Sequence, residues 1–109
     1  MIDRLRMRLA GLAASGTTIT YGQLARDLGL TGAGTIAQLT AALEALMEED
    51  ASQGLPFRAS LCEARLSGGM PAPGFFAKVA ALGREIGDPQ QFVATERAAL
   101  KGLAKASML

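Results

Sequence analysis

The chain has 109 residues, half of them apolar and only 5% aromatic, and its formal net charge is +1. This length and composition fit one folded domain with a single hydrophobic core and exclude a largely disordered chain. A nearly neutral chain has no overall positive potential that would attract nucleic acid or an anionic membrane. The sequence also contains no run of 18 or more apolar residues, which is what a membrane-spanning helix needs.

Two residue counts limit the chemistry that the chain can perform. It contains no histidine, which is the usual general base near neutral pH and the commonest metal ligand. Its single cysteine, Cys62, excludes a disulfide within the chain and, without histidine, the common structural zinc sites. We therefore expect no enzyme activity, cofactor, metal or small-molecule substrate. The N-terminus lacks the apolar centre of a signal peptide, so a cytoplasmic location is expected.

The first part of the chain predicts two helices and a link. Apolar residues spaced three or four apart predict a helix over 2–14, and residues 18–20 form an extended link. A second helix is expected over 21–28, with Thr20 as its N-cap, Gln23 completing a capping box and Gly29 as its left-handed C-cap.

A third helix is expected after Gly34. Its expected core stripe comprises Ile36, Leu39, Leu43, Leu46 and Met47, and its opposite face comprises Thr35, Gln38, Ala41, Ala42, Ala45 and Glu49. The run Glu48-Glu49-Asp50 lies at its C-terminal end, where the helix dipole disfavours negative charge. Fraying or a basic neighbour is therefore expected at that end.

The second half predicts a strand and two further helices. Phe57, Ala59 and Leu61 alternate with Arg58, Ser60 and Cys62, which is typical of a half-buried strand. Residues 67–69 predict a turn, and two prolines shorten any returning strand. One helix is expected over 74–86, and another after Asp88 as N-cap and Pro89 at its first position, with Arg97, Lys101 and Lys105 in a basic outer row. Cys62 is expected to be a small buried core residue.

Together these elements predict a mainly α fold with a small β element: about five helices and a short hairpin in a winged helix-turn-helix-like arrangement. One domain is expected over 1–109, with the helix-turn-helix and strand region at 15–66 and the C-terminal helices at 74–106.

The run from Ile19 to Ala25, which contains Tyr21-Gly22, resembles the start of the DNA-binding domain of O6-alkylguanine-DNA alkyltransferases. Residues 33–43 resemble that family's recognition helix, and residues 55–58 lie where the family places its Pro-Cys-His-Arg motif. Residues 68–69 and 74–75 resemble its later glycine-rich loop, and residues 78–82 its last helix. Phe57 stands in place of the reactive cysteine, so alkyl transfer is not expected, and Thr35 lies near the position of the arginine that enters the DNA stack.

Two functions follow as hypotheses. The first is a non-enzymatic module that binds double-stranded DNA weakly and mainly through phosphates. Between residues 31 and 50, Gln38 is the single side chain typical of base reading, and that segment has no lysine or arginine. The alternative is a protein-interaction or homodimerisation module on the same fold. The candidate contact residues for nucleic acid or a protein partner are Tyr21, Arg26, Thr35, Gln38, Arg58 and Arg65.

The surface around the third helix would separate these alternatives. A positive surface around the third helix favours DNA, and an acidic or flat apolar surface disfavours it. Tyr21 also has a purely structural alternative, in which its ring packs on the core and its hydroxyl bonds a backbone group.

Overall fold

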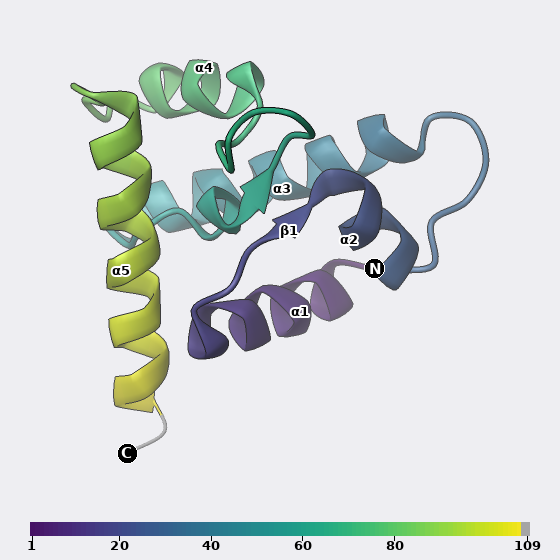
Figure 1. Cartoon of the computed structure of the whole chain (residues 1–109), viewed down its shortest axis with the longest axis horizontal. Helices are drawn as coiled ribbons and strands as arrows, with labels where there is room; N and C mark the ends of the chain where they lie inside the picture. Colours follow the sequence, from purple (N-terminus) through teal and green to yellow (C-terminus); the bar gives the residue numbers. More distant parts are fainter. Residues whose placement is uncertain (108–109) are drawn as a thin grey trace.

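The computed structural model describes residues 1–107 and is mainly helical with a small β element, which confirms the expected fold class (Figure 1). In order, these residues form α1 (Ile2–Ser15), β1 (Ile19–Thr20), α2 (Tyr21–Asp27), α3 (Thr35–Ser52), the 3₁₀-helix η1 (Arg58–Leu61), β2 (Cys62–Glu63), α4 (Pro73–Ala81) and α5 (Pro89–Ser107). α5 stands across the other helices and packs against α1 and η1 (Figure 1). No helix within 1–107 is both long enough and apolar enough to cross a bilayer.

α1 buries the predicted leucine face and is tied to α2 by a basic side chain. Leu5 and Leu9 are completely buried, and the helix ends at Gly16, whose φ of 69° is left-handed. The Arg4 guanidinium donates hydrogen bonds to the carbonyl oxygens of Leu28 and Asp27, each at 3.3 Å. A cation at the C-terminal end of α2 also complements the helix dipole.

α2 begins with the predicted cap. The Thr20 hydroxyl oxygen accepts a hydrogen bond from the backbone N–H of Gln23 at 3.2 Å. The capping box was expected to include a second hydrogen bond, from the Thr20 backbone N–H to the Gln23 side chain, and this prediction is wrong. The Gln23 side chain instead donates to the Asp27 carboxylate at 2.7 Å. The helix ends at Asp27, and Gly29 follows with a φ of 74° in the expected left-handed conformation.

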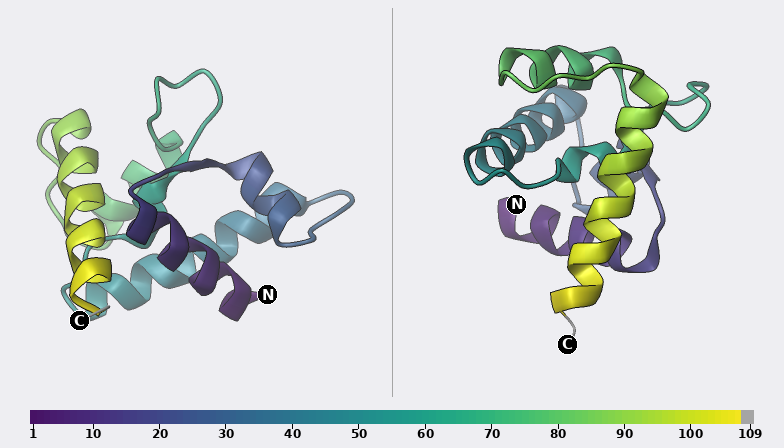
Figure 2. Two further views of the ribbon diagram at one scale, coloured as in Figure 1. Left: turned by 60° about the horizontal axis from the view of Figure 1, so that its bottom comes forward. Right: turned by 90° about the vertical axis from the view of Figure 1, so that its left-hand side faces the viewer.

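α3 departs from its expected pattern at two positions. Ile36, expected in the core, is 51% exposed, and Ala42, expected outside, is buried. α2 has only seven residues, and the loop of residues 28–34 swings away from the fold before α3 begins (Figure 2). The side of the first turns of α3 that carries Ile36 is therefore left uncovered.

The expected strand over 57–62 is wrong. Residues 58–61 form η1, which packs against α1, α3 and α5, and strand pairing is confined to β2. β2 pairs in parallel with β1, with Ile19 opposite Cys62. The alternation failed because Ser60 and Cys62 are small enough to be buried beside their apolar neighbours. Acidic side chains satisfy the first N–H groups of the segment: Phe57 N–H donates to Glu96 and Arg58 N–H to Asp50, both at 3.0 Å.

The loop of residues 64–70, called the 64–70 loop below, stands where the short hairpin was expected. A backbone hydrogen bond from Ala64 N–H to the Met70 carbonyl closes it at 2.9 Å, and it projects from the fold (Figure 2). Leu66 lies in the loop with a φ of 59° and a fully exposed side chain. The left-handed conformation costs a residue with a side chain about 1 kcal/mol.

The C-terminal helices follow the predicted order with one shorter boundary. α4 was expected to reach Ile86 but ends at Ala81, because Gly83 adopts a left-handed φ of 84° that breaks the helix. Asp88 caps α5 as predicted, accepting a hydrogen bond from Gln91 N–H at 2.9 Å. Arg97, expected in an outer basic row, is instead partly buried and donates to the carbonyls of Ser60 and Gly69 at 2.7 and 2.8 Å.

Candidate functional site

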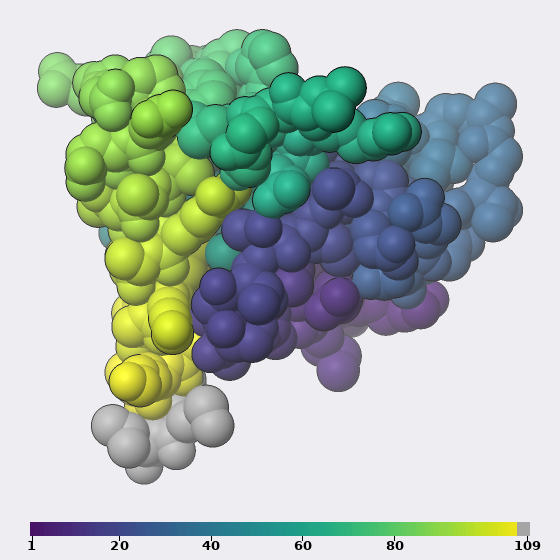
Figure 3. Space-filling view, in the orientation of Figure 1, coloured from purple at the N-terminus to yellow at the C-terminus, as the bar shows by residue number. Residues whose placement is uncertain are grey.

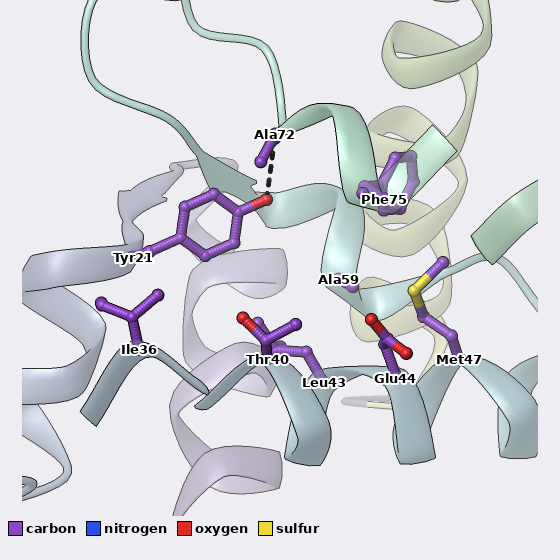
Figure 4. A pocket seen from close by; sticks show the side chains of 10 residues that line it. Tyr21, Ile36, Thr40, Leu43, Glu44, Met47, Ala59, Ala72 and Phe75 are labelled. Carbon is purple, nitrogen blue, oxygen red and sulfur yellow. Dashed lines mark hydrogen bonds between the residues drawn. The ribbon is translucent and has the colours of Figure 1, made fainter. Parts of the chain in front are cut away.

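An apolar groove lies where α3 passes the N-terminal ends of α2 and α4, with a volume of about 110 Å³. Its lining residues come from four segments of the chain and are mostly apolar (Figure 4). They are Tyr21, Ile36, Thr40, Leu43, Glu44, Met47, Ala59, Ala72, Gly74 and Phe75.

One face of α3 supplies half of this lining. Ile36, Thr40, Leu43, Glu44 and Met47 are three or four residues apart, so they follow the same side of the helix (Figure 4). Leu43 and Met47 are buried at the floor, whereas Ile36 and Thr40 are exposed at the edge. The groove therefore offers an apolar floor and an accessible apolar rim.

Tyr21 forms the opposite wall of the groove, and its hydroxyl bonds a backbone group as in the structural alternative. Its hydroxyl oxygen accepts a hydrogen bond from Ala72 N–H at 3.0 Å, which joins the start of α2 to the residue before α4 (Figure 4). Burial raises the pKa of the Tyr21 phenol, and the hydrogen bond from Ala72 partly opposes that rise. The side chain thus fixes the width of the groove.

The charge at the groove is negative. Glu44 points from α3 toward the opening (Figure 4), and among the residues that the structure describes it forms no ion pair. The nearby Glu48 pairs with Lys78 at 2.9 Å, and its side chain stays 59% exposed. α3 itself has no lysine or arginine. The groove face of this helix is therefore apolar, with Glu44 as a carboxylate that has no ion pair within the described residues.

The C-terminal end of α3 has the basic neighbours that its acidic run predicts. Arg58 donates to Asp50 and to Glu49 at 2.8 and 3.1 Å, and Arg6 of α1 forms two further hydrogen bonds with Glu49. Asp50 is 2% exposed. Hydrogen bonds from Arg6 and then Arg58 lower the pKa of Glu49 to about 2. This end of α3 is held by internal ion pairs.

The six predicted contact residues are not brought together. Tyr21 alone lines the groove, and the guanidinium of Arg58 faces the carboxylates of Asp50 and Glu49. Arg26 is exposed and donates to the Gln23 side chain, and the Thr35 hydroxyl donates to the Gly32 carbonyl. Gln38 is exposed on α3, and Arg65 is exposed in the 64–70 loop. They form no continuous basic strip.

Cys62 is fully buried, as predicted from the sequence. Desolvation raises the pKa of its thiol to about 12, so the thiol stays protonated at neutral pH. No group of three or more acidic or cysteine side chains within 1–107 is arranged to hold a metal ion.

The sequence does not predict the groove, because the spacing of Ile36 with Leu39 and Leu43 indicates a core position for a side chain that is 51% exposed. The available signal was the polar pair Thr40 and Glu44, which follows Ile36 at intervals of four along the otherwise apolar face. A buried helix face rarely carries a carboxylate without a partner, so this pair marks the side of α3 that faces solvent. The approach of Ala72 and Phe75 from a distant segment had no sequence signal.

Comparison of the chain with models of protein families, with curated proteins and with solved structures gives no match.

Proposed function

We propose that this chain is a non-enzymatic protein-interaction module, and that the apolar groove beside α3 binds a partner segment carrying an apolar side chain next to a basic one. The observation that carries the proposal is the exposed Ile36 at the rim of an apolar groove whose unpaired charge is the carboxylate of Glu44. A side chain that enters the groove is removed from water, and a neighbouring cation complements Glu44.

The groove provides features that favour a protein partner. Leu43, Met47 and Phe75 are buried by the fold itself, so the floor is present before any partner binds. Tyr21 is fixed by its hydrogen bond to Ala72. A preformed site loses little conformational entropy on binding, which favours affinity from a small contact area.

The DNA hypothesis has less support from the same surface. Phosphate contacts need basic side chains on the helix that approaches the duplex, and α3 presents Glu44 and Glu48 instead. Arg58 is engaged with Asp50, which removes it from the set of residues expected to contact phosphate. An acidic helix face repels the DNA backbone.

Fluorescence anisotropy with labelled probes tests the proposal. The probe is a synthetic amphipathic peptide of leucine and lysine, compared with the same peptide carrying glutamate for lysine and with a short duplex DNA at about 50 mM salt. We expect the leucine–lysine peptide to bind the most tightly. Ile36→Ser should weaken it about tenfold, because truncation of a central apolar contact removes much of the binding energy. Ala41→Ser, a surface change elsewhere on α3, is the matched control.

Three results would overturn the proposal. They are equal binding by Ile36→Ser and the wild type, preference for the glutamate peptide, and DNA binding that falls steeply with salt while neither peptide binds.

A further inference from the structure

The 64–70 loop presents an apolar side chain that does not pack against the rest of the described fold. Leu66 is 102% exposed and has a φ of 59°, a backbone conformation that residues other than glycine rarely adopt. Strained residues of this kind cluster at functional sites. Arg65, the residue before it, is also exposed. The loop therefore carries a cation and a large apolar group side by side, which is the chemistry proposed above for the occupant of the groove.

The loop is held in shape by hydrogen bonds rather than left free. The Ser67 hydroxyl lies within hydrogen-bond distance of the Ala64 and Met70 carbonyl oxygens, at 2.5 and 2.7 Å. Ala64 and Met70 also form the backbone hydrogen bond that closes the loop. Arg97 of α5 donates to the Gly69 carbonyl at 2.8 Å. In the space-filling view the loop (teal to green) lies at the surface between α5 and α2 (Figure 3). A loop that is already ordered loses little entropy when its tip is bound.

We infer that the groove of one copy of this chain receives Leu66 from a second copy, with Arg65 of that copy beside Glu44. This inference rests on the proposed function and names its partner. The groove volume of about 110 Å³ is several times the roughly 10–15 Å³ that one water needs, so it has room for the four side-chain carbons of leucine. Leu66 is fully exposed and so does not fill the groove of its own chain.

The connection between loop and groove favours a two-fold dimer. Ala72, which lines the groove, follows Met70 by two residues, so the loop leads directly into the groove wall. A projection and a receptor that neighbour each other on one molecule can both be satisfied across a single two-fold axis. Each copy then gives its loop and receives the other, and the contact closes as a dimer instead of extending into a chain.

Sedimentation velocity of the full chain over a concentration series tests the inference. The wild type should shift from monomer toward dimer as the concentration rises. Leu66→Ser should raise the dissociation constant at least about tenfold, because the leucine is the central apolar contact. Met7→Ser is the matched control, since Met7 is 74% exposed on α1 and lies outside the groove and the loop.

A charge exchange tests the pairing itself. Glu44→Arg and Arg65→Glu should each weaken dimerisation about threefold, because each places like charges together at a solvent-exposed contact. The double variant carries both changes in every copy and should restore the wild-type constant.

The results separate this inference from the proposed function. A wild type that stays monomeric to about 1 mM while its groove binds the leucine–lysine peptide overturns the dimer and leaves the groove function standing. Self-association that Leu66→Ser leaves unchanged also overturns the inference. Failure of both peptide binding and self-association overturns the two together. Loss of dimer in Leu66→Ser, with peptide binding kept, supports the inference.

Discussion

The acidic residues in the middle of α3 and at its C-terminal end have different surroundings. At the C-terminal end, Glu49 and Asp50 pair with Arg6 of α1 and Arg58 of η1, and Asp50 is almost fully buried. In the middle of the helix, Glu44 has no ion pair within the described residues and borders an apolar groove with exposed Ile36. The same helix thus holds the fold together at its C-terminal end and lines an open groove along the face from Ile36 to Met47.

This difference separates carboxylates that stabilise the fold from a carboxylate that is available to a partner. A carboxylate surrounded by donors of its own chain has its bonding capacity used, so its removal is felt as lost stability. A carboxylate beside exposed apolar atoms retains its capacity for a partner, so its removal is felt as lost affinity.

Asp50→Ala should cause the largest loss. Asp50 accepts hydrogen bonds from both the backbone N–H and the guanidinium of Arg58, which would remain partly buried without that partner. Removing one member of such a pair costs about 3 kcal/mol of unfolding free energy, measured by urea denaturation. Glu48→Ala is the control, because its pair with Lys78 is exposed and should contribute less than about 0.5 kcal/mol. Equal effects of the two changes would remove the distinction between buried and exposed pairs.

Tyr21→Phe should cost about 1 kcal/mol, since the Ala72 N–H loses its acceptor. Tyr21 is the single tyrosine of the chain, so ultraviolet absorbance of the phenolate reports its titration alone. In the folded protein the phenol should ionise above its ordinary pKa of 10, and stability should fall as the pH rises beyond 10. An ordinary titration in the folded protein would mean that the groove wall is open to water.

Glu49→Gln should have a smaller effect on stability, present at neutral pH and lost at acid pH. Its folded pKa of about 2 lies below the ordinary 4.5, so its ion pairs stabilise the fold above about pH 4.5 and are lost as the pH falls toward 2. The urea midpoint of the wild type should fall across this range, and Glu49→Gln should show a shallower fall. The variant should be less stable than the wild type at neutral pH and equal to it near pH 2. Parallel curves for the two proteins would contradict the assignment.

Much of the fold could be predicted because local signals agree with the tertiary structure. The leucine spacing of α1, the Thr20 cap of α2 and the Asp88 cap of α5 are each encoded within a few residues. The basic partners of the acidic end of α3 were also foreseen as a class, from helix-dipole electrostatics. The expected β element is present at 62–63, although its extent and its partner strand were not foreseen.

The remaining features depend on contacts between distant segments. η1 is helical because three helices surround it, which no alternation within 57–62 reveals. Arg97 looks like part of a basic outer row, and only the position of the Gly69 carbonyl explains why it turns inward. The groove likewise needs Ala72 to approach Tyr21 across 51 residues, so sequence periodicity could suggest its α3 face but not its opposite wall.

Amide chemical-shift mapping of the labelled protein with the leucine–lysine peptide tests the central claim most directly. The account predicts shifts concentrated at Ile36, Thr40, Glu44 and Phe75, with Asp50 and Arg58 unmoved. Shifts centred on the paired acidic end of α3, or none with the peptide but a cluster at Arg26 and Arg65 with duplex DNA, would contradict it.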